Sequence, residues 1–186
     1  MYTFVSLLRG INVSGQKFIR MTELKELYES LGFTKVTTYV QSGNVVFDCD
    51  NPDASEIGSA IEIEIERRFG FPVTVILRSP SDFQRIIDGN PFIHPRNEDP
   101  SKLYVTFLAS LPPAEISNDL KIPPGIKDEC ILRGKEIYLF CPNGYGRTKL
   151  SNSFFERRLK VLATTRNWKT VVAVYDIISS RKNTEV

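Results

Sequence analysis

The segment at residues 143–151 has the residue types of an anion-binding turn. It reads NGYGRTKLS and combines two glycines with Arg147 and Lys149, after two predicted strands. Glycine lets backbone N–H groups approach a ligand, arginine offers a planar pair of donors, and lysine offers a point charge. Together these groups suit a phosphate or a carboxylate. The sequence does not identify the anion, and an Asn-Gly turn without any ligand explains Asn143 and Gly144 as well.

Three further polar segments have the same character, at residues 9–12 (RGIN), 41–44 (QSGN) and 163–168 (ATTRNW). Each combines Gly, Asn, Ser or Thr with a neighbouring cation or amide. The candidate anion-binding residues are Arg147, Lys149, Arg166, Arg9, Gly144 and Gly146. The candidate residues for orienting the rest of a ligand are Asn12, Gln41, Ser42, Asn44, Asn143, Thr165 and Asn167. A structural alternative stays open, in which Thr165 or Asn167 caps the last helix and residues 41–44 simply turn.

Several familiar sites are not predicted. The only histidine, His94, lies in a proline-bounded loop without a G-x-S-x-G motif, which disfavours a Ser-His-Asp triad. The phosphate-binding motifs G-x-x-x-x-G-K-[ST] and G-x-G-x-x-G do not occur. The cysteines Cys49, Cys130 and Cys141 lack the spacing of a zinc site or a disulfide framework. We therefore expect no metal and no cofactor, and the sequence leaves open whether the protein is an enzyme.

Composition predicts a globular protein of the cytoplasm. The 186 residues are 41% hydrophobic and 25% charged, no apolar run approaches the ~20 residues of a membrane span, and the first residues do not resemble a signal peptide. Cysteines without a disulfide pattern favour a reducing compartment. The net charge is only +2, but residues 143–169 carry seven basic side chains against Glu156 alone, and residues 1–22 carry three against none. If these zones met in space, they would attract an anion.

The elements that must position these residues begin with a ferredoxin-like pattern. The predicted elements are strands at residues 2–8, 35–40, 45–47 and 73–77, and helices at residues 22–31 and 53–69. Thr22 and Asp53 have the residue type of helix caps, and Gly70 that of a helix end. The order is βαββαβ, which is typical of ferredoxin-like folds.

A second α+β part is predicted after a connecting helix that Ser79 caps. The predicted elements are strands at residues 103–108, 129–132 and 136–141, a short helix at residues 112–120, and two C-terminal helices joined by a loop at residues 163–168. Ser153 and Glu156 fit a capping box, so the first C-terminal helix is expected to begin at about Phe154. We predict an α+β fold with antiparallel sheets, in which residues 1–79 form a ferredoxin-like lobe and residues 80–186 a βαββαα lobe. A single fused sheet is the alternative.

Four segments of the chain resemble the hallmark segments of the bacterial domain of unknown function (DUF) 1697 family. They read LLRGINVSG, TYVQSGNVVF, NGYGRTKLSN and ATTRNWKTV, and the resemblance extends over residues 2–178. It implies a soluble, cytoplasmic α+β protein with a ferredoxin-like part. No activity is established for the family, so the resemblance implies no catalytic residue. It does make the four polar segments a shared signature, which favours a common site.

Three functions stay open. The favoured one is binding of a phosphorylated or nucleotide-like small molecule in a basic cleft between the lobes. The second is an RNA-binding module, because ferredoxin-like sheets carry RNA readers and Tyr39, Phe47 and Tyr104 are aromatic residues on predicted strands. The absence of an RNA-recognition motif at residues 43–47 and the low net charge argue against it. The third is a non-catalytic interaction or regulatory protein, and the sequence does not determine the oligomeric state.

Overall fold

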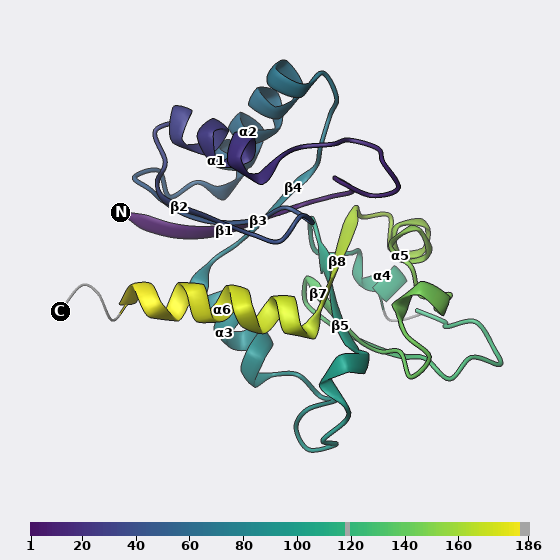
Figure 1. Cartoon of the computed structure of the whole chain (residues 1–186). Coiled ribbons are helices and arrows are strands. Elements are labelled where there is room, and N and C mark those ends of the chain that lie inside the picture. Colours follow the sequence, from purple (N-terminus) through teal and green to yellow (C-terminus); the bar gives the residue numbers. More distant parts are fainter. Residues whose placement is uncertain (118–119, 183–186) are drawn as a thin grey trace. The chain divides into compact units, whose positions relative to one another are not determined.

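The computed structural model describes residues 1–117 and 120–182, which form two compact units (Figure 1). The first unit holds Met1–Phe83 together with the described residues from Val174 onward, and the second holds Gln84–Ala173. The last helix therefore begins in the second unit and ends in the first. A division into domains at residues 1–79 and 80–186 stays a prediction.

The first unit contains a four-stranded antiparallel sheet in the order β2-β3-β1-β4. Its strands are β1 (Tyr2–Leu8), β2 (Thr34–Tyr39), β3 (Asn44–Cys49) and β4 (Val75–Arg78), and two helices, α1 (Met21–Ser30) and α2 (Ala54–Phe69), connect them. Both helices lie on the same face of the sheet (Figure 1). The predicted βαββαβ order is confirmed.

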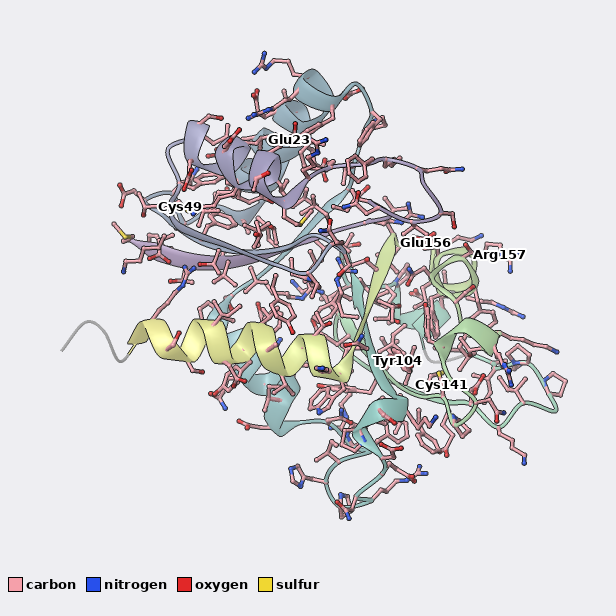
Figure 2. All side chains as sticks on the ribbon, viewed as in Figure 1. Glu23, Cys49, Tyr104, Cys141, Glu156 and Arg157 are labelled. Atoms are coloured by element: carbon pink, nitrogen blue, oxygen red, sulfur yellow. The ribbon has the colours of Figure 1, made fainter. Side chains whose placement is uncertain are left out.

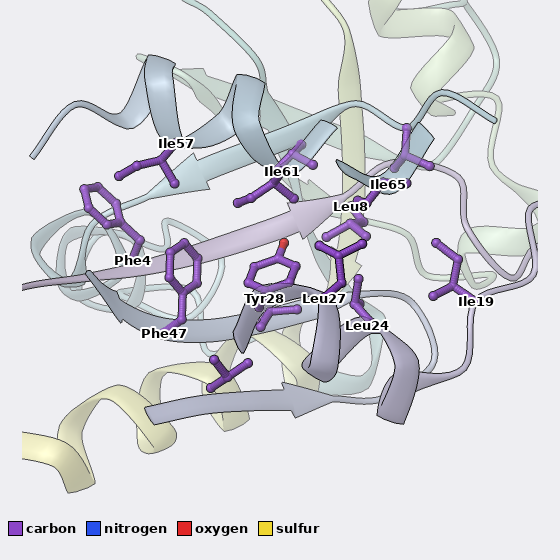
Figure 3. Packing of buried hydrophobic residues seen from close by; sticks show 14 of the residues in the cluster. Phe4, Leu8, Ile19, Leu24, Leu27, Tyr28, Phe47, Ile57, Ile61 and Ile65 are labelled. Atoms are coloured by element: carbon purple, nitrogen blue, oxygen red, sulfur yellow. The ribbon is translucent and has the colours of Figure 1, made fainter. Parts of the chain in front are cut away.

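The core of the first unit fills the space between that face and the two helices (Figure 3). Ile57, Ile61 and Ile65 follow one another at four-residue spacing on α2, and all three are buried. Tyr28 of α1 is fully buried, and its hydroxyl shares a hydrogen bond of 2.7 Å with the hydroxyl of Ser6 on β1. A buried hydroxyl needs such a partner, so this pair helps to hold α1 over the sheet.

The helix ends of the first unit agree with the sequence for α2 and differ for α1. Asp53 caps α2 by accepting hydrogen bonds of 2.8 and 3.2 Å from two N–H groups of the first turn, and Gly70 ends the helix with φ +78°. The prediction that Thr22 caps α1 is wrong. The helix begins one residue earlier, because Met21 packs against the core, and Arg20 at the cap position makes no side-chain capping bond.

The second unit contains another four-stranded antiparallel sheet, in the order β6-β7-β5-β8. Its strands are β5 (Leu103–Leu108), β6 (Glu129–Arg133), β7 (Glu136–Phe140) and β8 (Ala163–Asn167), and its helices include α4 (Ala114–Ser117) and α5 (Asn152–Leu159). Helix α3 (Pro80–Asp88) precedes these elements, and α6 (Trp168–Lys182) follows them. The two sheets are separate, which excludes a single fused sheet. Helix α4 is shorter than the predicted helix at residues 112–120, of which residues 118 and 119 lie outside the described part.

The segment predicted as a loop at residues 163–168 instead begins with strand β8. It pairs with β5, from Ala163 opposite Leu108 to Asn167 opposite Tyr104. The predicted order βαββαα is therefore wrong, and the second unit repeats the complete βαββαβ pattern before α6. The polar sequence ATTRN does not predict a strand, because it lacks the apolar alternation of a half-buried strand. This edge strand of five residues is stabilised by its pairing with β5.

The predicted cap of α5 is also wrong. The helix begins at Asn152, and Ser151, not Ser153, caps it by accepting a hydrogen bond of 3.3 Å from the N–H of Phe154. Glu156 does not turn back to a cap residue. Its carboxylate accepts a hydrogen bond of 2.9 Å from the N–H of Ala163 and so ties α5 to the start of β8.

Candidate functional site

The backbone of residues 143–151 is closed by its own hydrogen bonds. The N–H of Gly144 donates to the carbonyl of Cys141 (2.9 Å), and a short 3-10 turn at Tyr145–Arg147 follows. Within and after this turn, the N–H groups of Arg147 and Thr148 donate to carbonyls three residues earlier, each at 3.2 Å. Gly144 has φ +83°, a conformation that favours glycine. These N–H groups are already engaged, so an anion at this turn would depend mainly on side chains.

Tyr145 anchors the turn to the sheet. Its ring lies 5.1 Å from that of Tyr104, and its hydroxyl donates to the hydroxyl of Thr165 at 3.1 Å. Thr165 in turn donates to Asn152 (2.6 Å) and shares a hydrogen bond of 2.6 Å with Thr106. Burial raises the pKa of Tyr145, which keeps the phenol neutral. The structure thus gives Thr165, a candidate for orienting a ligand, a structural contact between β8, β5 and the turn.

A second contact fixes the other end of the turn. The hydroxyl of Thr148 donates to Oδ2 of Asp128 at 2.6 Å and accepts a hydrogen bond of 3.0 Å from the N–H of Leu150, which is fully buried. The exposed residues Arg147 and Lys149 flank Thr148. The turn is therefore held from inside by Thr148 and Leu150, while its two cations face solvent.

Arg147 and Lys149 line a pocket of about 450 Å³ in the second unit. In the part of the chain that the structure describes, its lining residues are Gly125, Ile126, Lys127, Asp128, Asn143, Arg147 and Lys149. Three cations and one carboxylate thus line this pocket. Within residues 1–117 and 120–182, the side chains of these cations form no hydrogen bond or ion pair. Sequence reasoning missed Lys127 and Asp128, because they lie about 20 residues before the turn and carry no motif of their own.

Arg166 and Asn167 have other contacts. Arg166 is buried and donates to the hydroxyl of Thr164 (2.8 Å) and to the carbonyl of Thr165 (3.0 Å). Burial lowers its pKa to about 10. Because neighbouring residues of a strand point to opposite faces, Arg166 and Thr165 lie on different faces of the sheet. Asn167 caps α6 by accepting a hydrogen bond of 2.8 Å from the N–H of Thr170, as the structural alternative anticipated.

The candidates of the first unit hold the loop after β1 against the β2–β3 hairpin. The amide of Asn12 donates to the carbonyls of Ile19 (2.9 Å) and Gln41 (2.8 Å), and its oxygen accepts from the N–H of Ile19. The buried amide of Asn44 donates to the carbonyl of Tyr39 and to the hydroxyl of Ser42. These amides close backbone turns of the first unit.

Arg9 and the hairpin glycine are held in the same loop region. The N–H of Arg9 donates to the carbonyl of Thr74 at 2.9 Å. Gly43 has φ +73°, and an added Cβ would lie 2.6 Å from Cδ1 of Ile11 and 2.8 Å from Cβ of Leu8. The hairpin turn therefore needs glycine at this position for its own packing. The expected convergence of the four polar segments involves both units and stays a prediction.

The described residues contain no group of three or more His, Cys, Asp or Glu side chains that could hold a metal ion. In the same part of the chain, none of the helices has the length and apolar character needed to cross a membrane. A further pocket of about 340 Å³ lies in the first unit, between α2 and the segment just before β4. Its lining includes Glu62 and Glu66 but none of the candidate residues, and Glu62 accepts a hydrogen bond from the N–H of Val75.

The arrangement of strands and helices defines the structural class of this protein. The protein is an α+β protein with two four-stranded antiparallel sheets, each in a βαββαβ arrangement, and a basic turn after β7. A family model described as "Protein of unknown function (DUF1697)" matches residues 1–138, so the chain belongs to this family. The match includes the segments LLRGINVSG and TYVQSGNVVF and ends before the basic turn.

A solved structure has the same fold over nearly the whole chain. It is described as "conserved bacterial protein SP0830 from Streptococcus pneumoniae", with 22% sequence identity and a TM-score of 0.71. The similarity covers 94% of this chain and 97% of that one. At this identity the likeness shows the fold alone. A search of curated proteins finds no match.

Proposed function

We propose that this protein binds a phosphorylated or nucleotide-like small molecule in the cytoplasm, with its anionic group held by Arg147, Lys149 and Lys127. The observation that carries this proposal is the pocket in the second unit, where these three cations lack acidic partners among the described residues. Single exposed cations are ordinary on protein surfaces. Three around one pocket, two of them on a turn that is held at both ends, are a better support for anion binding. The three free cysteines agree with a reducing compartment.

The cations alone support only weak binding. All three are exposed, and an exposed charge pair contributes about 1 kcal/mol at most, so bare phosphate should bind in the millimolar range. Physiological affinity would need further contacts, and Asn143 in the pocket lining is one source of amide hydrogen bonds. Roles for Arg9 and Arg166 as anion ligands, and for the polar residues of the first unit in orienting a ligand, stay predictions.

The placement of Phe47 and Tyr104 does not favour RNA binding. Phe47 is fully buried in the first core, where its ring stacks on that of Phe33 with centroids 4.6 Å apart. Tyr104 is half-buried beside Tyr145. RNA-binding sheets expose aromatic faces on which bases stack, and neither residue offers such a face in the open. An RNA oligonucleotide therefore serves as a comparison in the test below.

A thermal-shift screen tests the anion site. Inorganic phosphate, sugar phosphates, nucleotides and a single-stranded RNA are each added at about 10 mM, or at saturation for RNA, in low-salt buffer. A ligand present at ten times its dissociation constant stabilises the native state by about 1.4 kcal/mol, which raises Tm by about 3–5 °C for a chain of this size. We expect such a shift with phosphorylated small molecules.

A matched pair of variants then locates the effect. Arg147→Ala removes a pocket cation. Arg157→Ala instead removes an exposed cation of α5 (Figure 2), which is not among the residues that line the pocket. We expect Arg147→Ala to abolish the ligand-induced shift with nearly unchanged Tm of the free protein, and Arg157→Ala to retain the shift. An equal loss in both variants, or unfolding of Arg147→Ala alone, would contradict the proposed site. A shift with RNA only would favour the nucleic-acid alternative.

A further inference from the structure

Asp128 is an unusual member of a pocket that is otherwise basic. Among the described residues it is the only carboxylate in the lining, and it is 7% exposed. Its Oδ2 accepts the hydrogen bond from Thr148, and no other hydrogen bond or ion pair reaches its carboxylate from the described residues. A buried carboxylate normally collects several donors, so Asp128 retains accepting capacity on the side that Thr148 does not occupy.

This carboxylate opposes one kind of ligand and favours another. A second negative charge close to Asp128 is repelled, which weakens binding of a bare phosphate or of a ligand with anionic groups throughout. A neutral hydroxyl group can instead donate to the carboxylate, and a hydrogen bond to an ionised acceptor is about twice as strong as one between neutral groups. A ligand that carries one phosphate and hydroxyl groups nearby would use both parts of the pocket.

We infer, on the basis of the anion site proposed above, that the pocket selects phosphate monoesters of polyhydroxylated compounds, with Asp128 accepting a hydrogen bond from a ligand hydroxyl. Sugar phosphates and nucleoside phosphates belong to this class. The volume of about 450 Å³ lies in the range of small-molecule sites and leaves room beside a phosphate for the hydroxylated part. A ligand ammonium group would also pair with Asp128, but Arg147, Lys149 and Lys127 around it repel a cation.

Two esters of equal charge test this role. Glycerol 3-phosphate and propyl phosphate have the same carbon chain and the same phosphate, and only the first carries hydroxyl groups. Their dissociation constants for the full-length protein are measured by isothermal titration calorimetry. We expect glycerol 3-phosphate to bind about tenfold more tightly, because a hydrogen bond to a charged acceptor is worth at least that factor.

Asp128→Asn supplies the decisive variant. It keeps the shape of the side chain and a hydrogen bond to Thr148, and it removes the negative charge. We expect the preference for glycerol 3-phosphate to fall to about threefold or less, because a neutral acceptor forms the weaker bond. Propyl phosphate should bind to the Asp128→Asn variant more tightly than to the unaltered protein, because the carboxylate that repels its phosphate is gone. A merely structural role of Asp128 would weaken both esters alike. Arg157→Ala, which removes an exposed cation of α5 outside the pocket lining, is the control and should retain the preference for glycerol 3-phosphate.

The outcomes separate this inference from the anion site itself. Equal binding of the two esters, or an unchanged preference in Asp128→Asn, would overturn the role of Asp128 and leave the anion site standing. Tighter binding of phosphoethanolamine than of glycerol 3-phosphate would overturn the choice of a hydroxyl donor. If neither ester binds and Arg147→Ala changes nothing, the anion site is refuted, and the role of Asp128 falls with it.

Discussion

The C-terminal helix contributes an arginine to the first unit whose removal should destabilise that unit. Nη1 of Arg181 donates to Oδ1 of Asp48 at 3.2 Å. Nη2 lies 2.5 Å from the carbonyl of Lys35, and 3.0 Å from both the hydroxyl of Thr37 and the carbonyl of Val46. The sheet register shifts between Thr34 and Thr37, and Arg181 supplies donors at this irregular part of β2 and β3.

The loss of stability in Arg181→Ala depends on which partners the Asp48 carboxylate keeps. Asp48 is 3% exposed, and removing one partner of a buried ion pair costs about 3–5 kcal/mol. Two partners remain among the described residues, since the hydroxyl of Thr3 donates at 2.7 Å and Nζ of Lys35 lies 3.4 Å away. The ammonium of Lys35 is half-exposed and offsets only part of the loss. We therefore expect Arg181→Ala to destabilise the first unit by about 2–3 kcal/mol.

Native-state hydrogen exchange measures this loss locally. The opening free energy of amides in β2 and β3 should fall by that amount, whereas amides of β5 and β7 should change much less. Arg181→Lys keeps the charge but cannot reach the same set of acceptors, so it should give an intermediate value. A change below about 0.5 kcal/mol in β2 and β3, a size typical of neutral surface substitutions, would refute a structural role of this cluster.

Two further predictions concern a glycine and two thiols. Gly43→Ala should destabilise the protein by about 2–4 kcal/mol in urea unfolding, because the added Cβ would clash with Ile11 and Leu8 at a residue with positive φ. Gly146→Ala is the control, because its Cβ would meet open space, and it should change the free energy of unfolding by less than about 0.5 kcal/mol. Burial raises the pKa of Cys130 and of Cys141 from 9.0 to about 11. Between these pH values the folded state keeps protons that the unfolded state releases, so the free energy of unfolding should fall as pH rises from about 9 to about 11. Alanine variants of both cysteines should flatten this part of the urea-midpoint profile against pH, and an unchanged slope would contradict the assignment.

Local sequence patterns were sufficient for most elements. The isoleucine spacing of α2, its Asp53 cap and its Gly70 end depend only on neighbouring residues, and the structure shows all three. The β-branched residues of the first hairpin likewise predicted β2 and β3 from neighbouring residues alone. Such features are encoded within one turn of helix or one strand, where few other parts of the fold compete.

The missed elements depended on partners far along the chain. Strand β8 has a polar sequence and exists through its pairing with β5, about 60 residues earlier. The start of α5 was misplaced by two residues, because Ser151 and Ser153 both have the residue type of a cap, and in the structure the hydroxyl of Ser151 accepts the hydrogen bond from the N–H of Phe154. For β8 and for the start of α5, contacts within the second unit therefore determined a structure that the local sequence pattern did not predict.

The basic turn shows the same division between sequence and structure. By itself, the sequence determined that Arg147 and Lys149 stand on a glycine-rich turn after β7, because residue types and turn chemistry are local. Only the tertiary structure brought Asp128 and Lys127 to this turn, through the hydrogen bond between Thr148 and Asp128 across 20 residues. It also turned Thr165 and Arg166 to opposite faces of β8. Strand pairing and register decide which side chains meet, and a linear pattern records neither.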